Sequence, residues 1–214
     1  MLDFIFTSPI MFFTWILALL FAITIHEFSH AWTADRLGDP TPRLQGRITL
    51  NPLAHLDPVG TIMLIFFRFG WGKPVQFDPY NLKNPRRDAA LISLAGPASN
   101  LVAAGVFSIV LRSTGTLLPI IMTEAIIPTF IVLNILLAVF NLIPIHPLDG
   151  GKILVGILPS KDAHELDMFL QRYGIFILLL LIFPFAGVSP ISSFISPIMN
   201  FFLKILLPAS ATLV

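Results

Sequence analysis

The sequence predicts an all-α polytopic membrane protein. Of its 214 residues, 56% are hydrophobic, and the mean hydropathy is +0.86. Only 12% of the residues are charged, whereas soluble domains usually carry roughly 25%. Long apolar runs without a charge recur along the chain, which favours several transmembrane helices over one soluble core. We therefore expect a bundle of about four to five transmembrane helices in a lipid bilayer, with one additional short membrane segment.

Three segments are long enough to cross a bilayer as helices, which takes about 20 apolar residues. None of them contains a charged residue, and they are Phe4 to Ile25, Ala89 to Leu111 and Ile126 to Ile145. The run from Val59 to Phe67 is too short for an ordinary crossing, so we expect it to be re-entrant or packed against the bundle. The apolar region 174–208 is interrupted by prolines and could cross once or twice.

Two polar segments separate these apolar runs. Residues 40–58 alternate in polarity around Arg47 to Leu50 between turn formers, a pattern that allows a short strand or a small β-hairpin. Residues 159–172 form the longest polar stretch of the second half, and we expect a cytoplasmic loop there. This divides the chain into a core at 1–158 and a second part at 159–214, which holds the loop and the C-terminal membrane segments.

Basic residues are distributed unevenly over the connecting loops. If the short run does not cross, loops 33–58 and 73–88 lie on the same side and Arg112 lies on the other. The first side then holds seven basic residues: Arg36, Arg43, Arg47, Lys73, Lys83, Arg86 and Arg87. Because cytoplasmic loops are enriched in Lys and Arg, we expect the N-terminus outside. The net charge of +1 provides no basic field for nucleic acid.

The strongest chemical signal is the pentapeptide HEFSH at residues 26–30. On a helix, His26 and His30 share one face and can bind one zinc ion, while Glu27 can act as general base toward a metal-bound water. The chain has no cysteine, so any metal must be held by His, Asp or Glu. Ionisable residues in a membrane span are costly and usually functional, which favours a metal site over a chance pattern.

A catalytic zinc normally takes three protein ligands, so a third one is needed. Asp149 is the best candidate, because Pro144 and Pro147 interrupt the preceding helix and Gly150-Gly151 allow tight backbone turns. A carboxylate can then be delivered at the broken end of a span, on the same side of the membrane as His26 and His30. By the charge distribution this is the cytoplasmic side.

Together these motifs resemble the site-2 protease family of intramembrane zinc metalloproteases, in its compact form without appended regulatory domains. The resemblance extends from about Ala22 to Leu154 and rests on HEFSH, NPLAHLDPVGT, AGPASN and NLIPIHPLDGGKIL, which occur in the family's order. It implies one zinc per chain held by His26, His30 and Asp149, with Glu27 as the catalytic base. It also implies that the substrate is a transmembrane helix of another protein, and the compact form implies a prokaryotic cell membrane.

Three asparagines and one histidine extend the candidate site. Asn141 and Asn100 stand at positions where the family has asparagine, and a buried amide can donate to an oxyanion or a peptide carbonyl. We expect Asn141 to be a second catalytic residue, with interhelical hydrogen bonding as its alternative and as the expected role of Asn100 and Asn134. His146 replaces a residue that is commonly non-ionisable in relatives. It could be a fourth ligand, a partner of a ligand, or a titratable residue near water.

The expected function is hydrolysis of a peptide bond in a substrate's transmembrane helix near the cytoplasmic side, as in regulated intramembrane proteolysis. One alternative is a divalent-metal transporter that uses the same residues, but such proteins often have repeated halves, and no repeat is visible. A second alternative is a proteolytically inactive membrane scaffold. The intact Glu27 argues against a scaffold.

Overall fold

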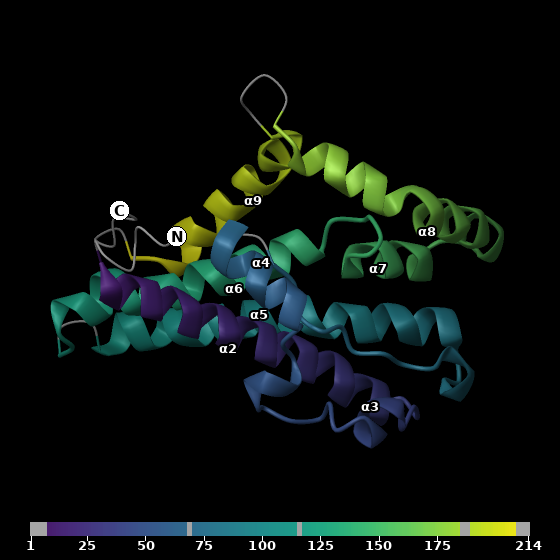
Figure 1. Ribbon diagram of the computed structural model, residues 1–214, viewed down its shortest axis with the longest axis horizontal. Helices are drawn as coiled ribbons and strands as arrows, with labels where there is room; N and C mark the ends of the chain where they lie inside the picture. Colours follow the sequence, from purple (N-terminus) through teal and green to yellow (C-terminus); the bar gives the residue numbers. More distant parts are fainter. Residues whose placement is uncertain (1–7, 68–69, 115–116, 185–188, 209–214) are drawn as a thin grey trace.

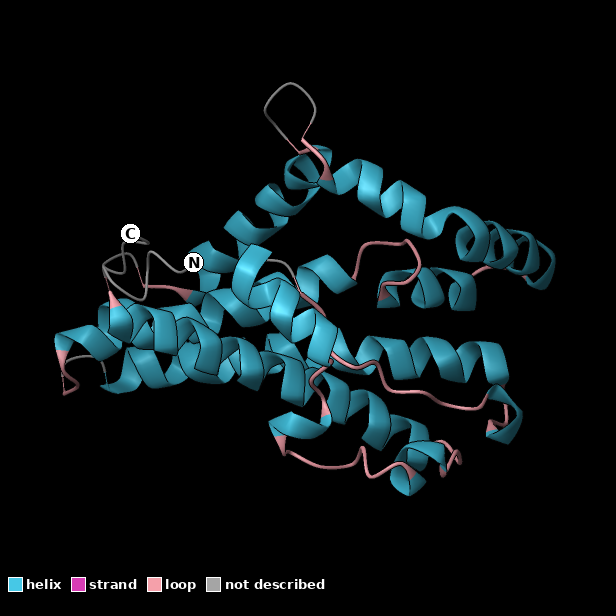
Figure 2. Cartoon of the chain, viewed as in Figure 1, coloured by secondary structure: helices cyan, strands magenta, loops and turns pink. Residues whose placement is uncertain are grey.

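The described part of the chain is helical. The computed structural model describes residues 8–67, 70–114, 117–184 and 189–208, and Figure 1 shows the order of their helices. Figure 2 shows helices and loops but no strand among these residues, where the only ladder element is an isolated antiparallel bridge between Leu56 and Gly72. The predicted all-α class is confirmed, whereas the β-hairpin within 40–58 is not confirmed.

Three long apolar helices form the centre of the molecule. They are α2 (Pro9–Arg36), α5 (Pro85–Thr114) and the continuous segment Met122–Asn141, which consists of the π-helical turn η3 (Met122–Ile126) and α6 (Ile127–Asn141). Among the described residues, these three helices are long and apolar enough to cross a membrane. They lie side by side, and α5 is antiparallel to α2, since Ala22 contacts Asn100 and His30 contacts Ile92 (Figure 1).

The ends of two central helices differ from the sequence prediction. Helix α2 continues to Arg36, well beyond the expected end at Ile25, so the HEFSH motif lies inside a long helix. The third span ends at Asn141 rather than Ile145, because Pro144 disfavours helix continuation ahead of it. This break was predicted from the prolines and is confirmed.

Short helices occupy the segment between α2 and α5. They are α3 (Thr41–Leu44), η1 (Pro52–Ala54), α4 (Pro58–Phe67) and η2 (Pro79–Asn81). Helix α4 has ten residues and is therefore about 15 Å long, roughly half of a hydrocarbon core. Its length agrees with the expectation that this apolar run does not cross the membrane.

The C-terminal part contains α7 (Asp149–Ile157), α8 (Ser160–Ile182) and α9 (Pro190–Leu206). The polar stretch 159–172 belongs to the first half of α8 and is not the expected loop, because it is rich in good helix formers such as Lys, Glu, Leu, Met and Gln. The apolar helix α9, with 17 residues, is shorter than an ordinary span. The predicted total of four to five spans is thus not confirmed.

An apolar cluster joins α5, α6 and the end of α9. Its buried members are Ala104, Leu111, Ile127, Ile131, Ile135, Val139 and Leu207. Polar contacts at the same place connect α5 to the C-terminal end of α9. Ser108 donates to Leu206 O at 2.5 Å, and Arg112 Nη2 donates to Ile205 O at 2.7 Å. The C-terminal carbonyls of α9, which have no partner within their own helix, are satisfied in this way.

Candidate metal centre

Helix α2 presents two imidazole rings toward α5. His26 and His30 are both buried, and their ring centroids are 4.6 Å apart, as expected for residues one helical turn apart. The backbone of α5 can approach these rings because residue 96 is glycine. A Cβ atom at Gly96 would overlap the rings of both histidines. The absence of a side chain at this position therefore makes room for the two imidazoles.

The break between α6 and α7 delivers the third candidate ligand. Residues 142–148 are not helical, and Asp149 is the first residue of α7. The two glycines that follow allow α7 to begin directly against this break. A Cβ atom at Gly150 would overlap the carbonyl of Ile143, and one at Gly151 would lie 2.8 Å from His146 N. The glycines thus serve close backbone approach and do not supply a positive φ.

The three side chains converge on a single point. Asp149 Oδ2 lies 3.1 Å from His26 Nε2 and 3.2 Å from His30 Nε2. Within the described residues this is the one group of three potential metal ligands, and its ligand atoms all lie within 4.8 Å of one another. Two ligand atoms that bind one tetrahedral zinc lie about 3.3 Å apart, since each is about 2.0–2.1 Å from the metal. The donor set therefore fits a zinc ion and leaves a fourth position for water.

The second nitrogen of each ring faces an oxygen atom. His30 Nδ1 lies 2.7 Å from the backbone carbonyl of Ile92, and His26 Nδ1 lies 2.6 Å from Oδ1 of Asn100. In each ring Nε2 is then the nitrogen on the side of Asp149. Such contacts to the outer nitrogen are characteristic of metal-binding histidines, because they fix the tautomer and the orientation of the ring.

Glu27 contacts the loop that follows α4. Its Oε2 accepts a hydrogen bond of 3.0 Å from the backbone N–H of Val75 and lies 3.9 Å from Nη2 of Arg47. The Arg47 side chain is almost completely buried, and it also donates to the carbonyl of Lys73. Burial lowers the pKa of Arg47, and the neighbouring Glu27 carboxylate offsets part of this decrease. The loops on both sides of α4 thus meet at the candidate base.

These contacts to Glu27 were missed in the sequence. Val75 is 48 residues from Glu27, and its contribution comes from the backbone, which leaves no pattern of side chains to find. In the sequence, Arg47 is one of several basic loop residues. Its position in the predicted strand gives no sign that it is buried. His55, which lies in the segment NPLAHLDPVGT, is also buried, and its Nε2–H donates to Thr49 O at 2.8 Å.

The other candidate residues lie outside the group of three. Asn141 is half-buried, and its Nδ2 donates to Leu137 O of its own helix at 2.9 Å, so its catalytic role stays a prediction. His146 does not join the metal group. Its Nε2 lies 3.0 Å from Oδ1 of Asp167 on α8, a pair that was not foreseen. His164 is exposed on the surface of α8.

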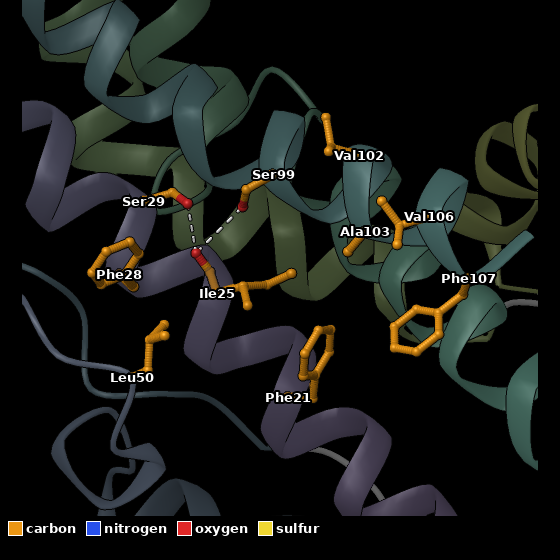
Figure 3. Close-up of a pocket in the computed structure, with 10 residues that line it drawn as sticks. All are labelled: Phe21, Ile25, Phe28, Ser29, Leu50, Ser99, Val102, Ala103, Val106 and Phe107. Carbon is orange, nitrogen blue, oxygen red and sulfur yellow. Dashed lines mark hydrogen bonds between the residues drawn. The ribbon is translucent and has the colours of Figure 1, made fainter. Parts of the chain in front are cut away.

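An apolar pocket lies between α2 and α5 (Figure 3). Its lining contains none of the candidate ligands and no charged residue: Phe21, Ile25, Phe28, Ser29, Leu50, Ser99, Val102, Ala103, Val106 and Phe107. The hydroxyl of Ser29 donates to Ile25 O at 2.7 Å, and the hydroxyl of Ser99 lies 2.7 Å from Gly96 O and 3.3 Å from Ile25 O. Both hydroxyls of this lining are thus engaged with backbone carbonyls, and the pocket is separate from the group formed by His26, His30 and Asp149.

A His-Glu-x-x-His helix and a distant aspartate, brought together among apolar helices, define the class of membrane-embedded metalloproteins. Comparison with known proteins identifies the family. Residues 115–183 match peptidase family M50. YwhC of Bacillus subtilis strain 168 is 37% identical over 199 residues, which cover 86% of this chain and 85% of that protein.

Two further relatives are the Rip2 proteins of Mycolicibacterium smegmatis and Mycobacterium tuberculosis strain H37Rv. They are 33% and 32% identical over 172 and 173 residues, which cover 77% of this chain and 65% of each relative. All three proteins are named as candidate zinc metalloproteases. No solved structure matches the chain. The chain belongs to peptidase family M50, the site-2 proteases, and is a zinc metalloendopeptidase.

Proposed function

We propose that this chain is an intramembrane zinc endopeptidase in which His26, His30 and Asp149 hold the metal and Glu27 is the general base. The observation that carries the proposal is the position of Asp149 Oδ2. It lies 3.1 and 3.2 Å from the two Nε2 atoms, although Asp149 is 123 residues from His26 along the chain. When bound at such a site, zinc lowers the pKa of water toward neutrality and polarises a carbonyl group.

Glu27 is restrained by the loop that follows α4. The hydrogen bond from Val75 N–H to Oε2 restrains its carboxylate, and in the proposed reaction Glu27 takes the proton of the attacking water. The Arg47 guanidinium, 3.9 Å from Oε2, keeps positive charge beside this carboxylate. Asn141 supplies an amide donor for the peptide carbonyl or the developing oxyanion. The chain thus contributes a base with a fixed position and a hydrogen-bond donor.

The substrate of the proposed enzyme is a transmembrane helix that has unwound locally. A helix whose backbone is fully hydrogen-bonded hides its carbonyls, so cleavage requires an extended segment. Val75 contacts Glu27 through its backbone N–H, so the edge formed by residues 75–77 begins next to the proposed base, and in this proposal the unwound segment binds there by strand addition. In this proposal residues 1–158 form the protease core, and residues 159–214 complete the membrane part.

Cleavage is proposed to occur near the cytoplasmic side of a cell membrane, with the N-terminus outside. Hydrogen bonds support the gathering of the basic loops at one end of the bundle. Asp39 accepts from Asp78 N at 2.7 Å and from Asn81 Nδ2 at 2.8 Å, which joins the loop after α2 to the loop before α5. Arg112 lies at the opposite end of α5. Because basic loops favour the cytoplasm, the end that carries the metal group is assigned to that side.

The proposal is tested by reconstituting the purified chain with a panel of single-span substrates. Cleavage is expected with the wild type and is expected to stop with Glu27→Gln or after addition of a chelator. A position-specific tag on each side of the substrate span reports where the cut lies. Cleavage that survives both treatments would contradict the mechanism, and a cut near the outer face would contradict the orientation.

A further inference from the structure

Two amide side chains are buried next to the metal group and are not explained by the reaction itself. Asn100 on α5 and Asn134 on α6 each have 0% of their surface exposed. A buried amide is costly unless its donors and acceptors are paired. Their contacts extend from the backbone of α6 to the ring of His26.

We propose that Asn100 and Asn134 form a relay that sets the tautomer of His26 and directs its Nε2 toward the metal. The inference rests on the proposed role of His26 as a zinc ligand. Neither asparagine is one of the three proposed ligands, and Asn100 acts on the site through its contact with His26; both are therefore positioning residues. The donor and acceptor of each hydrogen bond in the relay can be assigned from one group whose role is known.

This group is the backbone carbonyl of Phe130, which can only accept a hydrogen bond. Asn134 Nδ2 donates to Phe130 O at 2.8 Å, so the Oδ1 atom of Asn134 is left to face its neighbour as an acceptor. Asn100 Nδ2 donates to this Oδ1 at 2.9 Å. The orientation of the Asn134 amide therefore determines the orientation of the Asn100 amide.

The second hydrogen of Asn100 Nδ2 is used as well. It donates to Ala22 O on α2 at 2.9 Å, so two acceptors on different helices fix the same end of this amide. Asn100 Oδ1 then lies 2.6 Å from His26 Nδ1. An amide oxygen carries no hydrogen, so this contact requires the proton on Nδ1. The neutral ring consequently keeps its lone pair on Nε2, the atom that lies 3.1 Å from Asp149 Oδ2.

The two histidines reach the same tautomer by different routes. His30 uses a backbone carbonyl, that of Ile92, which no substitution removes. His26 depends on a side chain that is itself oriented by another side chain. The relay also connects α2, α5 and α6, so a purely structural role and a positioning role must be separated by experiment.

The separation uses substitutions of Asn100 in the full chain, purified in detergent, with zinc affinity measured by competition against a chromophoric chelator. Asn100→Leu removes the acceptor for His26, and we expect zinc to bind roughly 10- to 100-fold more weakly. Asn100→Asp keeps an oxygen for His26 Nδ1–H but cannot donate to Ala22 O or Asn134 Oδ1. We expect this variant to bind zinc about as tightly as the wild type while its thermal stability falls.

Ser108→Ala provides the matched control on the same helix. Ser108 is buried and forms an interhelical hydrogen bond to Leu206 O, but it has no contact with the metal group. This variant should lose stability and keep the zinc affinity of the wild type. If Asn100→Leu does not fold, Asn100→Ala removes the same acceptor without added bulk and is expected to give the same loss of affinity.

Two outcomes would overturn the proposal. If Asn100→Asp binds zinc as weakly as Asn100→Leu, then zinc affinity follows stability, and the amide pair is only structural. If Asn100→Leu and Asn100→Ala both keep the affinity of the wild type, the relay does not act on His26. His26→Ala distinguishes these results from failure of the proposed metal site, because retention of zinc in that variant would remove His26 from the site altogether.

Discussion

Helix α6 takes part in two regions of opposite character. In the apolar cluster, the side chains of Ile127, Ile131, Ile135 and Val139 pack against α5 and the end of α9. In the polar region, which we call the metal-side network, Asn134 connects α6 to Asn100, His26, His30 and Asp149. Apolar attraction has no preferred direction, whereas hydrogen bonds orient the groups that they join. We infer from this comparison that the apolar cluster holds the helices together and that the metal-side network orients the atoms proposed to bind the metal.

The largest effect is expected on the cleavage rate when the proposed base is replaced and both regions of α6 remain intact. Glu27→Gln should lower the cleavage rate by about 10²- to 10⁴-fold, the usual contribution of a general base. The zinc content should stay that of the wild type, because Glu27 is not among the three converging ligands. Single-turnover cleavage and metal analysis of the same preparation check both statements. A variant that lost its zinc would show that Glu27 acts through the metal site.

A cavity in the apolar cluster should reduce stability without changing the metal site. Ile131 has 0% of its surface exposed, so Ile131→Ala is expected to cost about 2–5 kcal/mol in the free energy of unfolding. Unfolding in detergent measures this cost, and zinc titration of the folded fraction measures the affinity. An equal loss of zinc affinity would show that the two regions do not act separately.

A methyl group added beside the histidine rings should weaken zinc binding, whereas the cavity in the apolar cluster should leave it unchanged. Gly96→Ala is expected to displace His26 and His30 and to weaken zinc binding roughly 10- to 100-fold. Gly105→Ala is the control on the same helix, because a Cβ atom at Gly105 meets nothing within 4 Å. It should leave the zinc affinity unchanged. Equal affinities for both variants would mean that the close approach at Gly96 is not required.

The smallest effect concerns a hydrogen-bonded carboxylate, Asp39, in the loop that follows α2. Burial would raise the pKa of Asp39, but hydrogen bonds from Thr41, Asn81 and Asp78 outweigh it and lower this pKa below its ordinary value. A carboxyl group with a lowered pKa contributes stability above its unfolded pKa, and this contribution is lost as the pH falls through the folded value. Asp39→Asn should therefore cost about 0.5–1.5 kcal/mol at neutral pH.

The same variant provides the pH test. The difference in thermal stability between the wild type and Asp39→Asn should shrink as the pH is lowered through the acid range, because protonation removes the advantage of the carboxylate. Thermal melts at a series of pH values measure it. A difference that stays constant with pH would show that the charge of Asp39 does not matter.

Sequence patterns predicted the elements whose signal is local. Helix periodicity placed both histidines on one face, and Pro144 predicted the break that lets Asp149 begin α7. The short α4 was anticipated from its length alone. In each case a few neighbouring residues determine the outcome. The polar start of α8 was misjudged because polarity was weighed above helix propensity, although Lys161, Glu165 and Gln171 all favour helix.

Contacts between residues that are far apart in the sequence could not be predicted from local patterns. Gly96 and Gly105 look alike in the sequence, yet only the first meets the histidine rings. The contact of Val75 with Glu27 uses a backbone N–H, and the pair of His146 and Asp167 joins residues 21 positions apart. Asn100 and Asn134 were expected to form interhelical hydrogen bonds, which is confirmed, but the extension of these bonds to His26 emerged only from the three-dimensional arrangement.

The central claim is that three residues from two distant segments hold one zinc ion. Its most direct test is the zinc content of purified Asp149→Ala beside that of the wild type. The account predicts about one zinc per wild-type chain and none retained by the variant after dialysis, because the two histidines alone leave the metal without its third ligand. A folded Asp149→Ala protein that retains one zinc per chain would contradict the account.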